Sequence, residues 1–342
     1  MPSSPPIQRD FSLRHLNSFG IDAKADAYLQ IFAVDGLKHL ADSTLKDVPR
    51  LALGGGSNIL LTGDFHGLVL HMCNRGIEVL GEQDDAIHVR AAAGENWHQF
   101  VQWTLAHNMP GLENLSLIPG SVGAAPIQNI GAYGVELREF MHELRAFDFD
   151  TSEVITLNNA ACQFAYRDSI FKHGLLGRAV ILDVTFALPK KWQPNVSYAD
   201  LANELNSLNC TTSPSPHQIS EAVIAVRTRK LPDPAVIGNA GSFFKNPLVS
   251  AAQRDALAAV SPNLVSYLQP DGRYKLAAGW LIDQCGWKGR SVGAAGVYEK
   301  QALVLVNRGG ATGEEIAKLA GLIQNDVRAR FDVMLEPEPV FI

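Results

Sequence analysis

An uncharged stretch rich in glycine, proline and alanine constrains the fold of this chain more than any other feature. Residues 118–134 hold four glycines, two prolines, three alanines and no charged side chain. Such a segment makes a poor surface loop, but it suits a backbone that wraps closely around a flat ligand with polar edges. A tightly packed crossover between two sheets is the structural alternative.

A second glycine cluster, Gly54-Gly55-Gly56, separates the strand-like runs 51–53 and 59–61. It predicts a turn in which backbone N–H groups can approach an anion. It is not a dinucleotide fingerprint, because Ile59 stands at the third glycine position. The chain also has no Gly-Lys pair, which excludes a Walker A loop. An ordinary structural turn is the alternative.

Composition excludes several functional classes. The 342 residues include 46% hydrophobic ones, enough for buried cores in two or three domains. The 29 Lys and Arg against 35 Asp and Glu give a net charge of −6 without a basic cluster, so we expect no nucleic-acid partner. No apolar run of about 18 residues and no signal-like N-terminal stretch is present, so we expect a cytoplasmic protein without membrane contact.

The four cysteines lie far apart in the sequence and form no metal-binding pattern. None of them belongs to a CxxC pair or a Cys/His cluster, so we expect no metal site and interpret them as buried thiols. They are Cys73, Cys162, Cys210 and Cys285. The histidines likewise lack partners at metal-ligand spacing, so we interpret them as structural or solvated.

Hydrophobic periodicity predicts an alternation of strands and helices. The first 70 residues indicate a small α+β unit, with a helix after Asp35 that carries Leu37, Leu40 and Leu45. Alternating strands dominate from about 75 to 190, around one helix at 96–107. Residues 211–216 are the best linker candidate, with Pro216 in the first turn of the next helix. Further along, we expect helices at 251–260, 276–285 and 313–331 and a strand at 302–307.

Five motifs, in order, give these features a specific resemblance. The two glycine stretches resemble the flavin- and phosphate-binding segments of vanillyl-alcohol-oxidase-like (PCMH-type) FAD domains. The segments 163–169 (QFAYRDS), 239–247 (NAGSFFKNP) and 335–338 (LEPE) complete the set. Together they resemble the UDP-N-acetylenolpyruvoylglucosamine reductase family from residue 17 to residue 338, nearly the whole chain.

The resemblance implies a fold class and a division into domains. The fold is α+β, with a PCMH-type FAD-binding fold in two subdomains and a C-terminal α+β substrate-binding domain. The first subdomain would comprise 1–73 with 333–342, the second 74–214, and the substrate-binding domain 215–332.

The resemblance also implies an activity. The family uses NADPH and FAD to reduce UDP-N-acetyl-3-O-(1-carboxyvinyl)glucosamine to UDP-N-acetylmuramate in peptidoglycan synthesis. The FAD should be non-covalent, because Ser57 stands where covalently flavinylated relatives often carry histidine. No second dinucleotide fingerprint exists, so NADPH and the sugar nucleotide should alternate in one cavity. We expect a monomer whose partners are these small molecules. An oxidase on the same fold and a binding protein without turnover are the alternatives.

Three residues would carry the chemistry. Arg167 would hold the substrate carboxylate, since a guanidinium fork matches two oxygens; an ion pair with Asp168 is the alternative. Ser242 would donate a proton to the carbanionic intermediate, and the alternative is a serine that satisfies a turn. Glu338 is either protonated or acts through Arg167 and water, and the sequence leaves both open.

Two further sets of residues follow from the matched motifs. The cofactor set is Gly54, Gly55, Gly56, Ser57, Asn58, Pro119, Gly120, Ser121, Gly123, Ala124, Gln128, Asn129, Tyr133 and Gly134. The substrate set, which would meet the diphosphate and uracil, is Tyr198, Lys230, Asn246, Tyr267 and Gln301. For the tyrosines Tyr198 and Tyr267, packing in a half-buried position is the alternative. Tyr267 also fits a mobile loop that closes over substrate in one family subtype.

Overall fold

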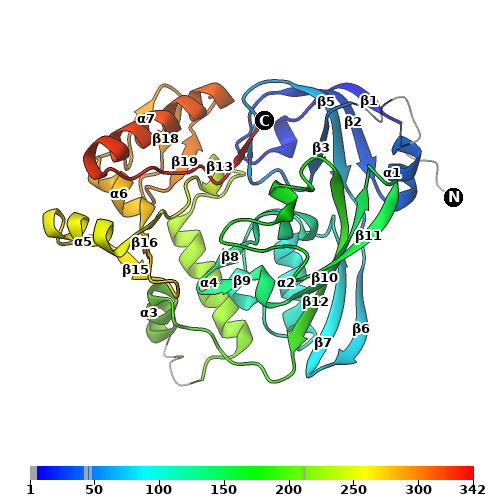
Figure 1. The fold of residues 1–342 in the computed structure, drawn as a ribbon, viewed down its shortest axis with the longest axis horizontal. Helices are drawn as coiled ribbons and strands as arrows, with labels where there is room; N and C mark the ends of the chain where they lie inside the picture. Colours follow the sequence, from blue (N-terminus) through cyan, green and yellow to red (C-terminus); the bar gives the residue numbers. More distant parts are fainter. Residues whose placement is uncertain (1–5, 42–44, 46–47, 209, 211–212) are drawn as a thin grey trace. The chain divides into compact units, whose positions relative to one another are not determined.

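The computed structural model describes residues 6–41, 45, 48–208, 210 and 213–342 (Figure 1). Where described, the chain forms two compact units. Unit 1 comprises Met1–Phe11, Ala25–Gly56 and Phe65–Arg229, and unit 2 comprises Ser12–Lys24, Ser57–Asp64 and Lys230–Ile342. The expected division into three domains remains a prediction. Of the expected linker, residues 211 and 212 lie outside the described residues.

The first sheet of unit 1 is mainly parallel. Its order is β1 (Gln8–Ser12), β2 (Lys24–Ile31), β5 (Phe65–Met72) and β3 (Arg50–Leu53). The strand β5 pairs in parallel with both β2 and β3, and its central residues are fully buried, as strands covered on both faces require. The helix α1 (Val34–Ala41) carries Leu37 and Leu40, but it ends before Leu45, which we expected to be helical.

The second sheet of unit 1 is antiparallel throughout. Its order is β11 (Glu153–Asn158), β10 (Met141–Asp148), β12 (Ala179–Pro189), β7 (Ala86–Ala92) and β6 (Ile77–Gln83). The central strand β12 is buried along most of its length. Its one carboxylate, Asp183, lies 2.6 Å from the guanidinium of Arg145 and 3.8 Å from that of Arg90. This pairing offsets the cost of a charge inside the sheet.

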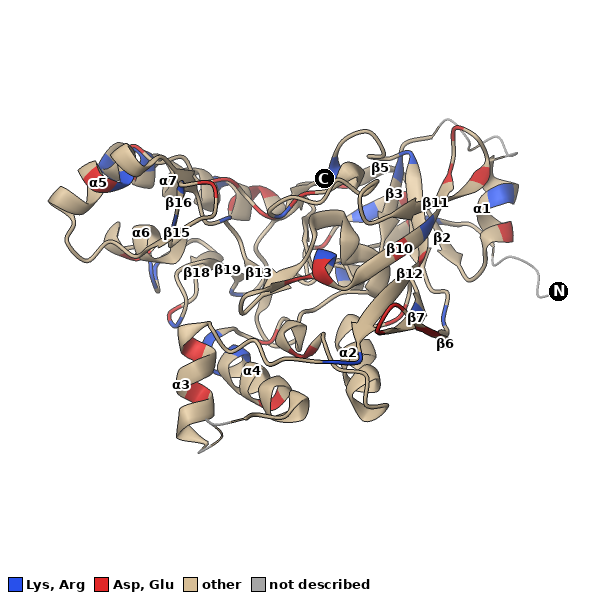
Figure 2. Ribbon diagram, turned by 60° about the horizontal axis from the view of Figure 1, so that its bottom comes forward, with Lys and Arg blue, Asp and Glu red and all other residues tan. Residues whose placement is uncertain are grey.

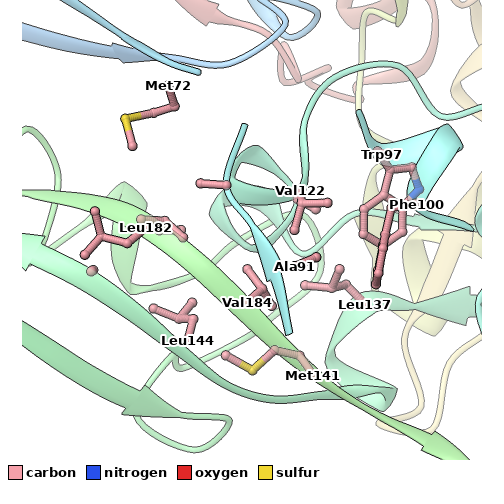
Figure 3. Close-up of a cluster of buried hydrophobic side chains, with 14 of the residues drawn as sticks. Met72, Ala91, Trp97, Phe100, Val122, Leu137, Met141, Leu144, Leu182 and Val184 are labelled. Atoms are coloured by element: carbon pink, nitrogen blue, oxygen red, sulfur yellow. The ribbon is translucent and has the colours of Figure 1, made fainter. Parts of the chain in front are cut away.

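The core of unit 1 joins this sheet to the helix α2 (Trp97–Ala106). Asn96 caps the helix by accepting the N–H of Gln99 at 3.0 Å, as its position before the apolar run predicts. Figure 3 shows Trp97 and Phe100 of α2 beside the buried residues of the strands. The indole N–H of Trp97 donates to the carbonyl of Leu115, so the largest core side chain leaves no polar group unsatisfied.

The thiols are only partly as predicted. Cys162 is buried in this core, and burial raises its pKa to about 12. Cys73, Cys210 and Cys285 are partly exposed, so the prediction of four buried thiols is wrong for these three. All four are free cysteines.

The helices α3 (Ala199–Ser207) and α4 (Pro216–Lys230) lie side by side (Figure 2). Leu201 and Leu205 of α3 pack against Ile219 and Val223 of α4. The start of α4 at Pro216 confirms the prediction. The hydroxyl of Ser220 on α4 accepts a hydrogen bond from Gln102 at 2.9 Å and shares one with Ser116 at 2.8 Å. These bonds fix α4 against α2.

Unit 2 is built from small antiparallel sheets, one parallel strand pair and three helices. One sheet has the order β13 (Gly238–Ser242), β19 (Val304–Asn307), β18 (Ala295–Val297) and β17 (Ser291–Val292). Another has the order β14 (Leu248–Val249), β16 (Tyr274–Leu276) and β15 (Ser266–Leu268). The parallel pair joins β4 (Ile59–Leu60) to β20 (Val340–Phe341).

The helices of unit 2 are α5 (Ala251–Val260), α6 (Ala278–Gln284) and α7 (Gly313–Phe331). They agree with the predicted positions. In α7, Thr312 and Glu315 form the predicted capping box, and Ile316, Ile323 and Val327 are fully buried. Among the described residues, no helix is both long enough and apolar enough to cross a membrane. The same residues include no group of three His, Cys, Asp or Glu side chains placed to hold a metal ion.

Candidate active site

The two glycine stretches meet inside unit 1. A β-carbon on Gly54 would lie 2.1 Å from the Oγ of Ser121, and one on Gly55 would lie 3.0 Å from the Cα of Gly120. Glycine is therefore required for the two backbones to approach, since a side chain would collide. Gly123 is equally constrained, because its β-carbon would lie 2.5 Å from that of Ala93. The result is a close approach of two main-chain segments with few side chains between them.

Asn129 fastens the turn that follows the second of these segments. The residue is fully buried, and its Nδ2 donates to the carboxylate of Glu136 at 2.9 Å and to the carbonyl of Ala165 at 3.1 Å. Its Oδ1 accepts the N–H of Arg138 at 3.0 Å. The side chain of Asn129 therefore has a structural role, and its contact with the cofactor remains a prediction.

Arg167 lies on a tight turn between Ala165 and Asp168. The side chain of Asn129 donates to the carbonyl of Ala165 and so fixes the start of this turn. One Nη of Arg167 donates to the carbonyl of Gly131 at 2.9 Å. The carboxylate of Asp168 lies 2.8 Å from Nε2 of His173. The guanidinium is therefore placed by main-chain contacts beside the 129–134 turn.

Two predicted residues from different sets, Tyr133 and Tyr198, pack edge to face with ring centroids 5.3 Å apart. Burial raises the pKa of Tyr133, so its phenol is neutral at pH 7. Asn114 holds the two segments together: its Nδ2 donates to the carbonyl of Tyr133 at 2.9 Å and to that of Asn195 at 2.8 Å. Tyr198 retains 42% exposure, which leaves its edge accessible to a ligand.

Left-handed backbone conformations gather in these segments. Asn129, Tyr133 and Arg167 have φ values of 43°, 49° and 56°, and Leu117 has 57°. Non-glycine residues adopt this region at a cost and usually where other contacts enforce it, often at functional sites. Leu117 was not among the predicted residues, and it directly precedes the 118–134 stretch.

Arg227 of α4 is a second residue that sequence reasoning missed. Its Nε–H donates to the carbonyl of Leu117 at 3.1 Å. Burial lowers the pKa of Arg227, as does the neighbouring charge of Arg167. A helical pattern could have found it, because Arg227 follows Val223 by four residues and Ser220 by seven, on the buried face of α4.

A bulge in unit 2 positions Ser242 at the end of β13. The pairing of β13 with β19 shifts register between Asn239 and Ser242, and Gly241 there has φ of 69°. The buried Asn239 accepts the N–H of Gly241 at 2.9 Å and donates to the carbonyl of Ile237 at 2.8 Å. In the described part of the chain, the Ser242 hydroxyl has no hydrogen-bond partner, so it does not satisfy the turn.

Glu338 lies on a segment that pairs with the residues after Ser242. The N–H of Glu338 donates to the carbonyl of Phe243 at 2.8 Å, and the N–H of Lys245 donates to the carbonyl of Glu336 at 2.9 Å. The side chain of Asn58 donates to the carbonyl of Glu338 at 3.2 Å. The structure thus brings Asn58, Ser242 and Glu338 together within unit 2, whereas Arg167 belongs to unit 1.

The neighbouring glutamate has a different environment. Glu336 has a side chain 70% exposed and lies 3.2 Å from Nζ of Lys245. After Glu338, Val340 donates its N–H to the carbonyl of Asn58 at 3.0 Å, and β20 continues along β4. The polypeptide on both sides of Glu338 is therefore anchored by strand-type hydrogen bonds.

The predicted substrate residues of unit 2 are less closely grouped. Asn246 accepts the N–H of Ala278 at 2.9 Å at the start of α6. Gln301 borders the same helix, because a β-carbon on Gly279 would lie 3.0 Å from its Oε1. Tyr267 lies on β15 with 51% exposure, and Lys230 is the last residue of α4. The structure brings Asn246 and Gln301 to one helix terminus.

Comparison with known proteins connects this arrangement to one family. Residues 38–158 match the FAD binding domain family, and residues 233–342 match the C-terminal domain of UDP-N-acetylenolpyruvoylglucosamine reductase. The predicted α+β fold class is thereby confirmed in both of its parts. A crystal structure of that reductase from Thermus caldophilus has a TM-score of 0.67 at 20% identity and covers 98% of both chains, which shows a shared fold.

Full-length relatives are closer in sequence. The UDP-N-acetylenolpyruvoylglucosamine reductase of Paraburkholderia phymatum is 58% identical over 341 residues, 99% of each chain. That of Burkholderia mallei is 54% identical over 340 residues, 99% of this chain and 98% of the relative. The chain therefore belongs to the UDP-N-acetylenolpyruvoylglucosamine reductase family.

Proposed function

We propose that this chain uses NADPH and FAD to reduce UDP-N-acetyl-3-O-(1-carboxyvinyl)glucosamine to UDP-N-acetylmuramate, a step of peptidoglycan precursor synthesis. The observation that carries the proposal is the identity of 58% of residues over 99% of the chain with a reductase of that name. The free Ser242 hydroxyl and the anchored Arg167 add chemical support.

The residues of unit 1 fit FAD. The main-chain surface made by Gly54, Gly55, Gly120 and Ser121 offers N–H groups without side chains, which suits the diphosphate and the flat ring of a flavin nucleotide. The remaining predicted cofactor residues would add further contacts to FAD. When bound, FAD supplies the hydride carrier between NADPH and the enolpyruvyl group.

Arg167 would bind the carboxylate of the enolpyruvyl group. Reduction at the terminal vinyl carbon leaves negative charge on the carbon next to that carboxylate, so a cation beside it stabilises the transition state. The bond from Arg167 to the Gly131 carbonyl and the strained backbone fix the guanidinium before substrate arrives. Such preorganisation avoids a reorganisation cost during the reaction.

Ser242 would donate the proton that completes the reaction. A hydroxyl is a weak acid, but the carbanionic intermediate is a strong base, and proton transfer can therefore be downhill. The Ser242 hydroxyl suits this role because no other group in the described chain occupies it. Glu338 lies on the segment that pairs with the residue after Ser242, and its carboxyl would orient the substrate carboxyl through Arg167 and water.

Substrate and location complete the proposal. Lys230, Asn246, Tyr198, Tyr267 and Gln301 would bind the sugar nucleotide, with Lys230 neutralising the diphosphate. NADPH and the sugar nucleotide would alternate at the flavin, since the sequence carries no separate dinucleotide fingerprint. The enzyme would act as a cytoplasmic monomer on these small molecules.

A steady-state assay tests the function. FAD-reconstituted protein should consume NADPH only when the enolpyruvyl substrate is present, and the product should be heavier by two hydrogens in mass spectrometry. NADPH consumption with matching oxygen uptake and no change in the sugar nucleotide would instead identify an oxidase. Ligand binding without NADPH consumption would identify a protein that has lost turnover.

A further inference from the structure

Glu113 is a buried acid in unit 1 that has hydrogen-bond donors as partners but no cation. It opens the short turn η2 (Glu113–Leu115) and is only 2% exposed. Its Oε2 accepts the N–H of Gly111 at 2.7 Å, and its Oε1 accepts the indole N–H of Trp192 at 2.6 Å. In the described part of the chain, no basic side chain pairs with it. Burying an acid without a cation costs free energy, so these two bonds must have a use.

Both partners of Glu113 are N–H donors, which explains why the residue is an acid. A carboxylate carries acceptors only, so each of its oxygens can meet one donor. A glutamine of the same shape would direct its own NH₂ group at one of the two donors and lose that bond. The two bonds therefore join the turn after α2 to Trp192, which follows the end of β12 by three residues.

Trp192 opens a segment, residues 192–197, that belongs to no helix or strand. Because the segment has no ladder of its own, contacts with other parts of unit 1 fix its position. Trp192 packs against the buried cluster that α3 and α4 form. The carbonyl of Asn195 accepts from Nδ2 of Asn114 at 2.8 Å, and Nδ2 of Asn195 donates to the carbonyl of Gly134 at 3.0 Å. Two adjacent residues of η2 thus hold the segment at Trp192 and at Asn195.

Tyr198 follows this segment directly and is the N-cap residue of α3. Its ring packs edge to face on that of Tyr133, with centroids 5.3 Å apart. Tyr133 packs against the same cluster of α3 and α4, and its carbonyl accepts from Asn114 at 2.9 Å. Tyr198 retains 42% exposure, so a ligand can reach it from solvent. The relative position of the two rings therefore depends on the turn that carries Glu113 and Asn114.

We propose that Glu113 is a positioning residue for the sugar nucleotide: through Trp192 it holds residues 192–198 so that Tyr198 lies against Tyr133 before the nucleotide binds. The inference rests on the proposed function, in which Tyr198 binds the sugar nucleotide, and adds to it a residue outside the matched motifs. A segment that becomes ordered only on binding loses conformational entropy at that moment, which lowers affinity. Because Glu113 acts through Tyr198, its effect should fall on affinity and not on the chemical step.

Glu113→Gln tests this role, because it keeps the shape of the side chain and removes one of its two acceptors. Asp148→Asn is the matched control, since Asp148 is also 2% exposed, lies on β10 of the same unit and pairs with Arg178 at 2.6 Å. Each substitution weakens the hydrogen bonds of a buried carboxylate, so both should lower the melting temperature. Both variants should bind FAD as fully as wild type.

Affinity for the enolpyruvyl substrate is the decisive readout, measured by calorimetry on the oxidised, FAD-reconstituted protein without NADPH. Glu113→Gln should raise the dissociation constant by at least about 5-fold, because the cost of ordering the segment is then subtracted from binding. Asp148→Asn should change it by less than about 2-fold, since distant sites act independently. The rate of flavin reduction at saturating NADPH should change by less than about 2-fold in both variants.

A double-mutant cycle with Tyr198→Ala separates positioning from general stability. In the Tyr198→Ala background, Glu113→Gln should raise the dissociation constant by less than about 2-fold, because the residue that Glu113 positions is absent. Losses that add in the double variant would show that Glu113 acts elsewhere, and they would overturn the proposal. An unchanged dissociation constant in Glu113→Gln, at a lower melting temperature, would make Glu113 purely structural and would also overturn it.

Trp192→Phe supplies an independent check, and it replaces Glu113→Gln if that variant does not fold. It removes the same hydrogen bond from the other partner and keeps a ring in the cluster of α3 and α4, so it should reproduce the loss of affinity. Full affinity in Trp192→Phe, or an equal loss in Asp148→Asn, would contradict the proposal. If Tyr198→Ala alone binds as tightly as wild type, Tyr198 leaves the substrate set and the proposal fails with it. Failure of wild type to reduce the enolpyruvyl substrate would overturn the proposed function instead.

Discussion

The two units hold their candidate functional residues by different means. In unit 1, buried polar side chains and left-handed backbone fix short turns, as Asn129 does for the turn beside Arg167. In unit 2, strand-type hydrogen bonds between distant segments place Ser242 beside Glu338. The turn that carries Arg167 in unit 1 is therefore held by buried amides and left-handed backbone, whereas the position of Ser242 in unit 2 depends on pairing of segments from different parts of the chain.

This difference suggests that the residues of unit 1 and unit 2 contribute to different steps of the reaction. A guanidinium that is already held in place does not have to reorganise when an anion binds. Such preorganisation favours binding of the anion and stabilisation of its charge in the transition state. A hydroxyl at a strand bulge remains free to donate a proton. Changes in unit 1 should therefore alter affinity and stability, and changes at Ser242 should alter one chemical step.

Ser242→Ala should give the largest effect. The loss of the proton donor should slow reoxidation of the reduced flavin by the enolpyruvyl substrate by at least about 100-fold, the typical contribution of general acid catalysis. Reduction by NADPH should stay nearly unchanged. Stopped-flow absorbance measures both half-reactions, with Ser242→Cys as the control that retains a donor and more activity. Equal losses in both half-reactions would remove Ser242 from the assigned role.

Asn129→Ala should chiefly affect stability. It deletes the bonds to Glu136, Ala165 and Arg138 and leaves buried polar groups unsatisfied, at a cost of about 2 kcal/mol. Thermal unfolding followed by tryptophan fluorescence should show a lower melting temperature. An unchanged melting temperature would mean that unit 1 is not held by this amide.

Thiol labelling should distinguish the cores of the units. Burial holds the pKa of Cys162 at about 12, so at pH 8 it is a protonated, inaccessible thiol that labels only when unit 1 opens. The partly exposed Cys285 of unit 2 should label at least about 10-fold faster. Mass spectrometry of digested protein gives the two rates, and equal rates would contradict the more rigid packing around Cys162.

Glu336→Gln should have the smallest effect. Its exposed pair with Lys245 contributes less than about 1 kcal/mol, so turnover should stay within about 2-fold of wild type. The same substitution at Glu338 should lower turnover by at least about 10-fold, because glutamine supplies neither a carboxylate nor a carboxylic acid. Similar turnover rates for both variants would show that turnover depends on the main-chain pairing of this segment and not on the Glu338 side chain.

Local sequence patterns predicted the local structure, whereas the expectation that the chain end returns to residues 1–73 came only from the family resemblance. The helices, the capping box at Thr312 and the glycine turn follow from periodicity and turn chemistry. The pairing of Glu338 with Phe243 and of Val340 with Asn58 joins segments far apart, which no local pattern reveals. Lone cysteines carry no periodic signal, and three of them were wrongly expected to be buried.

The residues of the candidate site divide in the same way. The roles of Arg167 and Ser242 followed from the resemblance to the reductase family, whereas the glycine stretches by themselves indicated only a close approach of main chain. Arg227 lies outside the five motifs, and its contact with the Leu117 carbonyl joins residues that are far apart in the sequence. Burial of an arginine in such surroundings is a tertiary property, so only the structure could show it.

The most direct test of the account is an anaerobic experiment on the FAD-reconstituted protein. NADPH should bleach the flavin absorbance, and subsequent addition of UDP-N-acetyl-3-O-(1-carboxyvinyl)glucosamine should restore it while UDP-N-acetylmuramate forms. Both steps on one flavin are what the account predicts. A flavin that bleaches but is not restored by the enolpyruvyl compound, or a protein that binds no FAD, would contradict it.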